Sequence, residues 1–246
     1  MNRLFAAMKL DVIVQVRNNL YTIGIAAGLL VAIALSQLAT PDQLPAVIPT
    51  LMLLVVGGST LLYVAGIITF EKDEGTLSAN FVSPLRIGEY LGSKVTTLTT
   101  LATVESIVMI GGALLIMWLW TGYTVAELLL PNLMILLIGI LAIGIIYTLV
   151  GIILIVRYDK FTDFLIPMSA VAVVLQMPFL YFLGWVKHWV FLLIPTSGPT
   201  MIMQGAYTEL APWEWAYGIG YTAVLLVGLT FWAYRTFEKH VTLKVG

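Results

Sequence analysis

Apolar residues along this chain occur in long runs that are separated by short polar segments. A helix that crosses the hydrocarbon core of a bilayer needs about 20 mostly apolar residues, and six runs reach that length. The pattern therefore predicts an all-α integral membrane protein with a single transmembrane domain over residues 1–246. The six predicted spans are residues 20–39, 46–70, 95–118, 128–156, 164–186 and 215–234. The fourth run is longer than a bilayer requires, so we expect a tilt, or a kink near Pro131.

Residues 2–18 precede the first span and carry an amphipathic pattern. One arc of a helix is formed by Leu4, Phe5, Met8, Val12 and Val16. The charged residues of this stretch, Asp11 among them, lie off that arc. The pattern predicts a helix that lies in the headgroup plane of the membrane. The alternative is a frayed N-terminal tail.

The segment between spans five and six also departs from a plain hydropathy pattern. Residues 189–194 and 201–203 are apolar but too short to cross the membrane, and the sequence Pro195-Thr-Ser-Gly-Pro199 is expected to break any helix. The segment either re-enters the membrane and returns or lies along the outer surface. Pro195, Gly198 and Pro199 are candidates for an outer gate, and an inert surface loop is an equally open alternative.

Basic residues fall in alternate connecting segments. The N-terminal stretch, the loop between spans two and three, the loop between spans four and five and the C-terminal tail hold every Lys and Arg except Lys187. Lys and Arg are enriched in cytoplasmic loops. The distribution therefore predicts a multi-pass plasma-membrane protein with both termini in the cytoplasm.

The composition excludes several classes of protein. With 60% apolar and 10% charged residues, the chain is far from a soluble domain, which has about 25% charged residues. The net charge of −1 offers no basic surface to nucleic acid. The chain has no Cys and two His, so we expect no thiol chemistry, no bound metal and no cofactor. Signatures of membrane enzymes such as G-x-S-x-G and H-E-x-x-H are absent, so we expect no catalytic residues.

The loop between spans two and three, residues 71–94, is called the elbow below. Gly75 is placed to end the helix that emerges from span two, in the left-handed conformation that favours Gly. Thr76 or Ser78 then caps a short helix through Val82, and Ser83-Pro84 opens a second helix that leads into span three. The pattern predicts a rigid amphipathic projection suited to docking, with an ordinary connecting loop as the alternative.

The elbow resembles a known family. Its pattern is Glu71-x-x-Glu74-Gly75-Thr76-Leu77, then Val82-Ser83-Pro84-Leu85-Arg86, then Glu89-Tyr90-Leu91 and Ser93-Lys94. This is similar to the coupling-helix region of permeases of the type-two ABC exporter superfamily. Four further segments are similar to the fluoroquinolone export permease group: Asp11 to Arg17, Glu105-Ser106, Arg157 to Pro167, and Ile194 to Pro199. The resemblance covers the whole chain.

This resemblance implies a prokaryotic export permease without its own motor. No phosphate-binding loop of the form G-x-x-x-x-G-K-[ST] is present, so ATP and Mg²⁺ are expected on a separate ABC ATPase subunit. A second permease subunit, identical or related, is expected to complete a path for an amphipathic drug or a lipid-like substrate, with spans one, two and five toward that path. The residues expected to couple the ATPase are Glu71, Glu74, Gly75, Thr76, Leu77, Phe81, Pro84, Leu85 and Arg86.

A few polar residues fall inside the predicted spans. Glu105 lies near the middle of span three, where an ionised side chain costs roughly 3 kcal/mol. We expect its carboxyl group to be neutral or paired, either as a structural hydrogen bond to a neighbouring span or as a substrate contact or protonation switch. Gln176 lies just before Pro178 and is expected to satisfy backbone groups freed by that Pro near Val174. Thr60 and Tyr63 either line a path for the substrate or are packing residues between membrane helices.

Other functions fit the sequence less well. The main alternative is a membrane scaffold or sensor that docks an ATPase through the same elbow but transports nothing. An ABC importer is disfavoured, because importer permeases use a different cytoplasmic loop.

Overall fold

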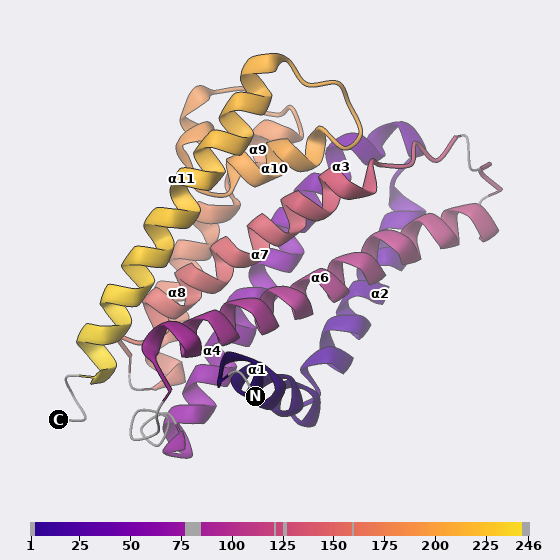
Figure 1. The fold of residues 1–246 in the computed structure, drawn as a ribbon. Helices are drawn as coiled ribbons and strands as arrows, with labels where there is room; N and C mark the ends of the chain where they lie inside the picture. Colours follow the sequence, from indigo (N-terminus) through magenta and orange to yellow (C-terminus); the bar gives the residue numbers. More distant parts are fainter. Residues whose placement is uncertain (1–2, 77–84, 121, 125–126, 159, 243–246) are drawn as a thin grey trace.

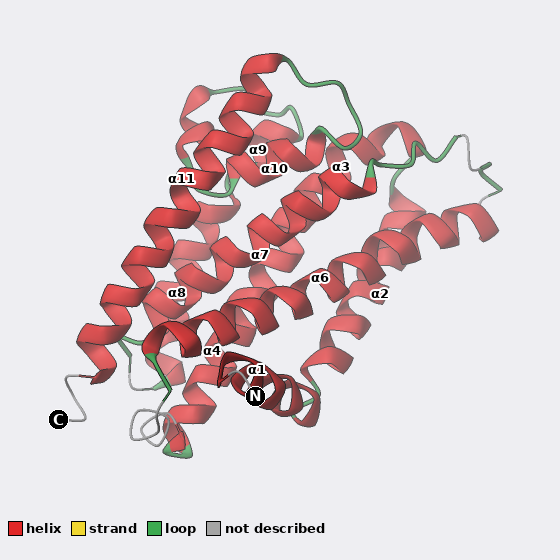
Figure 2. Cartoon of the chain, viewed as in Figure 1, coloured by secondary structure: helices red, strands yellow, loops and turns green. Residues whose placement is uncertain are grey.

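A computed structural model gives the fold of residues 3–76, 85–120, 122–124, 127–158 and 160–242. All regular structure in these residues is helical (Figure 2). Six stretches of helix are long and apolar enough to cross a bilayer, which confirms the predicted all-α membrane fold. They are Leu20–Leu38, Pro41–Asp73, Ile87–Trp120, Leu133–Ile155, Phe161–Phe182 and Pro212–His240.

The N-terminal helix α1 (Arg3–Arg17) lies across one end of the bundle and packs on helix α6 (Ile87–Trp120) (Figure 1). Phe5, Val12 and Val16 of the predicted apolar arc are exposed and its other two members are partly buried, whereas Asp11 and Gln15 are buried against the protein. A helix therefore forms where the amphipathic pattern predicts one. Its apolar face is turned outward, which is the arrangement of a helix that lies on a membrane surface.

Span two is interrupted. After helix α2 (Leu20–Leu38), the chain forms the 3₁₀ turn η1 (Pro41–Gln43), α3 (Leu44–Leu51), the π-helical turn η2 (Met52–Val56) and α4 (Gly57–Asp73). Pro49 lies inside α3 and brings no N–H, and a π-turn changes the helical register next to it. Side chains of other helices bind this turn: the Tyr147 hydroxyl donates to the carbonyl oxygen of Leu53 (3.2 Å), and Gln176 Nε2 donates to that of Leu54 (3.1 Å).

The position of Gln176 corrects the prediction for its side chain. The carbonyl oxygen of Val174 near Pro178 accepts a bond from the Met177 N–H instead. The neighbouring carbonyl oxygen of Leu175 accepts a bond from the Thr196 hydroxyl at 2.5 Å. Because the backbone at this bend is served by other groups, the Gln176 amide is available to bind span two.

The starts of spans three and four differ from the predicted ones. Helix α6 is continuous from Ile87, well before residue 95, so the second half of the elbow belongs to the helix of span three. Helix α7 (Leu133–Ile155) begins later than residue 128, because the Asn132 side chain accepts bonds from the backbone N–H groups of residues 134 and 135 and caps the helix. With 23 residues, α7 has about the length that a bilayer requires. The helix is therefore shorter than the predicted run of residues 128–156, and Pro131 lies just before its start rather than at a kink inside it.

The last third of the chain contains α8 (Phe161–Gln176), α9 (Phe179–Phe182), the 3₁₀ turn η3 (Trp189–Leu193), α10 (Ser197–Gln204), α11 (Pro212–Phe237) and the π-helical turn η4 (Glu238–Thr242). The predicted helix break over residues 195–199 is wrong at its C-terminal end. Helix α10 begins at Ser197 and includes Pro199, because a Pro in the first turn of a helix gives up no intrahelical hydrogen bond.

Helix α10 is part of the protein interior. Every residue from Ser197 to Met203 is buried, and the helix packs against α7, α11 and α3. The contact with α11 is close: a Cβ atom built on Gly198 would lie 2.5 Å from the Thr222 hydroxyl oxygen. Helix α10 therefore joins the bundle by packing, although it is too short to cross a membrane.

Candidate functional site

Two clusters of polar side chains are buried among these helices. The first, called the lysine cluster, consists of Asp11, Glu71, Tyr90, Ser93 and Lys94. The second, called the glutamate cluster, consists of Ser59, Tyr63 and Glu105. The lysine cluster lies at the end of the bundle where α1 packs, and the glutamate cluster lies along the middle of α6.

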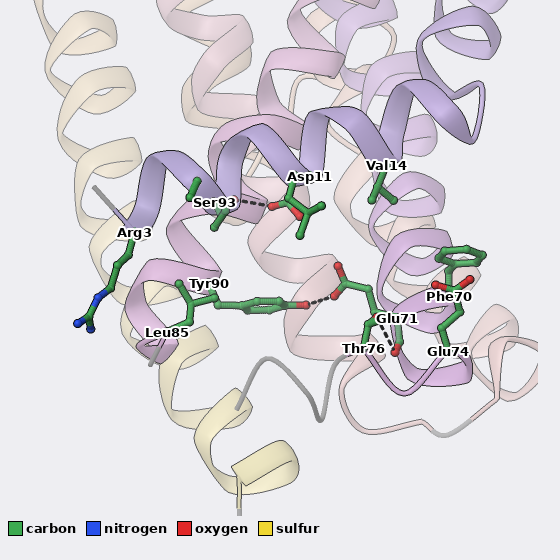
Figure 3. Close-up of a pocket in the computed structure, with 13 residues that line it drawn as sticks. Arg3, Asp11, Val14, Phe70, Glu71, Glu74, Thr76, Leu85, Tyr90 and Ser93 are labelled. Carbon is green, nitrogen blue, oxygen red and sulfur yellow. Dashed lines mark hydrogen bonds between the residues drawn. The ribbon is translucent and has the colours of Figure 1, made fainter. Parts of the chain in front are cut away.

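Lys94 is the centre of the lysine cluster. Its ammonium group binds Asp11 Oδ1 of α1 at 2.5 Å and Glu71 Oε1 of α4. The other carboxylate oxygens are also satisfied, since the Ser93 hydroxyl donates to Asp11 Oδ2 at 2.5 Å and the Tyr90 hydroxyl donates to Glu71 Oε2 at 2.6 Å (Figure 3). Three helices are thus joined through one side chain.

The charge of this cluster does not balance internally. Two carboxylates share one ammonium group, and the side chains of all three residues are about 90% buried or more. Burying ions is costly unless each is paired and hydrogen-bonded, and here all four carboxylate oxygens have partners. The cluster is therefore a buried network that depends on its single cation.

Further contacts extend the lysine cluster along α6. Gln15 Nε2 donates to the Thr97 hydroxyl oxygen at 3.0 Å, so α1 binds α6 at a second point. The Tyr90 ring lies 5.1 Å from the Phe237 ring at the end of α11. Lys72 Nζ donates to the carbonyl oxygens of Ile155 (3.0 Å) and Tyr158 (2.6 Å) at the end of α7. The ends of five helices meet here.

A cavity of about 510 Å³ lies beside the lysine cluster, between α1, α4 and the start of α6 (Figure 3). Ala6, Ala7, Leu10 and Val14 of α1 form one apolar wall. The rest of the lining adds Arg3, Asp11, Phe70, Glu71, Glu74, Thr76, Leu85, Tyr90 and Ser93. The cavity thus combines an apolar wall with a wall on which acidic groups are concentrated.

The described part of the elbow borders this cavity. Gly75 follows α4 with a φ of +68°, which confirms the predicted left-handed end. Glu74 and Arg86 are exposed, the Thr76 hydroxyl donates to the Glu71 carbonyl oxygen (3.2 Å), and Leu85 is half-buried. The remaining predicted coupling residues, Leu77, Phe81 and Pro84, lie outside the described residues.

The glutamate cluster joins α4 to α6. Glu105 is fully buried, and its Oε2 accepts bonds from the Ser59 hydroxyl (2.8 Å) and the Tyr63 hydroxyl (3.3 Å). Its other oxygen, Oε1, has no hydrogen-bond partner. The structure therefore brings Glu105 and Tyr63 together, as a hydrogen bond between spans three and two.

The other polar candidates are dispersed. Thr60 is buried and its hydroxyl donates to the Val56 carbonyl oxygen (2.6 Å) within its own helix, which is a packing arrangement. Gln176 binds span two, as described above. Pro195 precedes α10, and Gly198 and Pro199 lie in its buried first turn. None of these residues lines the large cavity.

The opposite end of the molecule holds a second cavity, of about 450 Å³, between Gly205–Leu210 and Trp215. The Tyr207 hydroxyl group there is buried and has no hydrogen-bond partner. Burial raises the pKa of Tyr207, so the group stays a neutral donor. Among the residues that the structure describes, no three His, Cys, Asp or Glu side chains are grouped to hold a metal ion.

Sequence reasoning missed the pairing of Asp11 with Lys94, because it counted both among ordinary charges near the membrane surface. A signal was present in the spacing. Asp11 and Gln15 are four residues apart on α1, and Tyr90, Lys94 and Thr97 follow one another at steps of four and three on α6. Such steps place polar groups on a single helix face, and two such faces can bind one another.

Comparison with known proteins agrees with this architecture. Residues 2–245 match the family described as the fluoroquinolones export permease protein family. The chain belongs to this family. Two proteins, each named a fluoroquinolones export permease protein, are 29% identical over 250 residues, which covers 100% of this chain and 99% of theirs. They come from Mycobacterium tuberculosis strains CDC 1551 / Oshkosh and ATCC 25618 / H37Rv. The chain is therefore a multi-pass membrane protein of an export permease family.

Proposed function

We propose that this chain is the membrane subunit of an ABC exporter, driven by a separate ATPase subunit that docks on the elbow. The family match over residues 2–245 carries the permease function. The M. tuberculosis relatives are named for fluoroquinolones, so a fluoroquinolone is the first substrate to test within the class of amphipathic drugs and lipid-like molecules. A second permease subunit, identical or related, completes the path.

The contacts at the base of the elbow support the coupling role. Glu71 at one end of the elbow and Lys94 at the other bind each other, and Lys72 binds the end of α7. A force applied to the elbow would therefore act on α4, α6 and α7 together. This is the property that an element needs in order to pass the closure of an ATPase to membrane helices.

The sequence supports the assignment of ATP to the partner. It lacks the G-x-x-x-x-G-K-[ST] loop that binds nucleotide phosphates. ATP and Mg²⁺ would then bind to the ATPase subunit, and this chain would bind no cofactor and catalyse no reaction of its own. The Lys and Arg distribution supports placing both termini, and therefore the elbow, on the cytoplasmic side.

The experiment compares transport and ATP hydrolysis with and without the partner. The permease is produced with nucleotide-binding subunits encoded by neighbouring genes, and the purified complex is placed in lipid vesicles with a fluoroquinolone. We expect ATP-dependent movement of the drug only with both subunits present. Drug transport by this chain alone would overturn the proposal, and ATP turnover that moves no substrate would favour the scaffold alternative.

A variant of the elbow tests the coupling directly. Glu74 is exposed beside Gly75 at the end of α4, so Glu74→Ala removes a surface charge without disturbing the core. We expect drug-stimulated ATP hydrolysis to fall several-fold while the protein remains folded. Glu209→Ala, which removes an exposed acidic group near the second cavity, is the matched control and should leave stimulation unchanged.

A further inference from the structure

Glu105 differs from the other buried acidic residues of this protein. Asp11 and Glu71 are bound to an ammonium group, and all of their carboxylate oxygens have partners. Glu105 is more deeply buried, and among the described residues no Lys, Arg or His forms an ion pair with it. Within the part of the chain that the structure describes, its donors are two neutral hydroxyl groups, both directed at Oε2.

The surroundings of Glu105 favour its neutral form. A carboxylate in an apolar interior is stable only with a counter-charge or several strong donors. The donors from α4 are Ser59 and Tyr63. From α2, Gly24 and Gly28 lie close to Glu105, and neither carries a charge. Oε1 receives no bond at all. A proton on Oε1 removes the charge and leaves Oε2 as the acceptor for both hydroxyl groups.

Helix α2 covers this site and is held along one face only. Its buried residues are Gly24, Gly28, Ala32, Leu35 and Ser36. A Cβ atom built on Gly24 would lie 3.2 Å from the Tyr63 hydroxyl oxygen, and one built on Gly28 would lie 2.9 Å from the carbonyl oxygen of Glu105 itself. Ile23 and Leu30 on the other side of α2 are exposed, and Leu20, Tyr21 and Val31 are partly buried. The seam between α2 and α6, a close contact at Gly24 and Gly28, therefore lies over Glu105.

We propose that Glu105 carries a proton in this conformation and exchanges it with water when α2 moves off α6. In the covered state the carboxyl group is neutral. When the seam opens, water hydrates the group and accepts the proton from Oε1, which leaves a carboxylate and a hydronium ion. When the seam closes again, the carboxylate must take up a proton before it is buried. Glu105 therefore releases and binds one proton each time α2 moves off α6 and returns.

The link between this cycle and export rests on the proposed function, but the proton site does not. A permease that opens α2 toward its path during transport would exchange a proton in every transport cycle. The tests below use the permease alone. Their failure would leave the export proposal intact, and a failure of ATPase coupling would leave the proton site intact.

The first test measures the protonated carboxyl group by infrared spectroscopy. The full-length protein in lipid vesicles at neutral pH is compared with Glu105→Gln, and the difference spectrum should contain the C=O stretching band of a protonated carboxyl group. The same comparison with Glu209→Gln, at an exposed position, should contain no such band. Absence of the band in the Glu105→Gln difference overturns the proposal.

A second variant keeps the test decisive if Glu105→Gln does not fold. Ser59→Ala retains Glu105 but removes the donor that lies 2.8 Å from Oε2. The protonated carboxyl band should move to higher frequency, because the C=O bond loses a hydrogen bond. A carboxyl band that is present and unaffected by Ser59→Ala would belong to another residue and would contradict the assignment.

The last test asks whether α2 shields the carboxyl group of Glu105 from water. Gly28→Val places a side chain against the backbone of Glu105 and must separate α2 from α6, whereas Gly111→Val on α6 meets no atom within 4 Å. After transfer to D₂O, the carboxyl band of the wild type and of Gly111→Val should shift slowly, and that of Gly28→Val should shift several-fold faster or be lost. Equal exchange in Gly28→Val and Gly111→Val overturns the role of the seam.

Discussion

Lys94 binds two buried carboxylates from different helices. Its replacement by Met leaves Asp11 and Glu71 without a cation while it preserves the length of the side chain. Breaking a buried ion pair in this way costs about 3–5 kcal/mol. We expect Lys94→Met to lower the free energy of unfolding by about that amount, measured by chemical or thermal unfolding in detergent.

A matched control separates the effect of losing a buried charge from the effect of losing any positive charge. Lys9→Met removes the same charge from an exposed position on α1 and should change the free energy of unfolding by less than about 1 kcal/mol. Adding Asp11→Asn and Glu71→Gln to Lys94→Met should restore part of the stability, because no buried charge is then left unpaired. Unchanged stability of Lys94→Met would contradict the description of the cluster as a network that depends on its cation.

At the residue scale, the sequence predicts that a buried polar group must be neutral or hydrogen-bonded, but it does not predict which residues bind that group. A carboxyl group in the middle of a span must be neutral or paired on energetic grounds alone, and Glu105 is found bound by two hydroxyl groups. The packing of α4 against α6 decides which hydroxyl groups can reach Glu105. The hydropathy of the sequence does not predict how two helices pack. The same reason explains why Gln176 was expected to bind its own helix but binds span two.

At the scale of elements, the contact of α4 with α7 is especially close at Gly57, which has no side chain. A Cβ atom on Gly57 would lie 2.2 Å from the Tyr147 ring, and the Tyr147 hydroxyl donates to the π-helical turn just before α4. Gly57→Ala should therefore destabilise the protein by about 1–3 kcal/mol, the usual cost of overpacking a core, measured by thermal unfolding in detergent. Gly66→Ala on the same helix meets no atom within 4 Å and should have no destabilising effect.

A double variant tests whether Tyr147 is the cause. Tyr147→Leu on its own removes a buried aromatic ring and should be destabilising. In the presence of Gly57→Ala, the same change should cost less, because the added methyl group occupies part of the space. Strictly additive losses would show that the two positions do not interact.

Span existence follows from the sequence, whereas span boundaries depend on local capping and packing. Six apolar runs are enough to predict six spans. The start of α7 is set by Asn132, a capping residue inside an apolar run, and the continuity of α6 back to Ile87 is supported by the lysine cluster, which packs its polar first turns against α1. Helix α10 could not be predicted, because its Gly and Pro residues lie in a first turn that packing against α7 and α11 stabilises.

At the scale of the whole molecule, contacts gather the basic segments of the chain at one end. Asp11 of α1 binds Lys94 of α6, Lys72 at the end of α4 binds Tyr158 after α7, and the Tyr90 ring packs on Phe237 at the end of α11. These pairs join the four segments that hold all Lys and Arg residues except Lys187. Figure 1 shows α1 and the C-terminal end of α11 on that side of the bundle. The fold thus gathers at one end the segments that the positive-inside rule assigns to the cytoplasm, and this is the topology that we propose.

The absence of Cys from the sequence makes that topology directly testable. Lys187→Cys and Lys239→Cys each introduce a unique thiol at an exposed position, near opposite ends of the molecule. A maleimide that does not cross membranes should label Lys187→Cys in intact cells and Lys239→Cys only after permeabilisation, because a cytoplasmic thiol is shielded by the bilayer. The cysteine-free wild type is the blank. The reverse pattern would place the elbow outside the cell, out of reach of any ATPase, and the coupling proposal would fail with it.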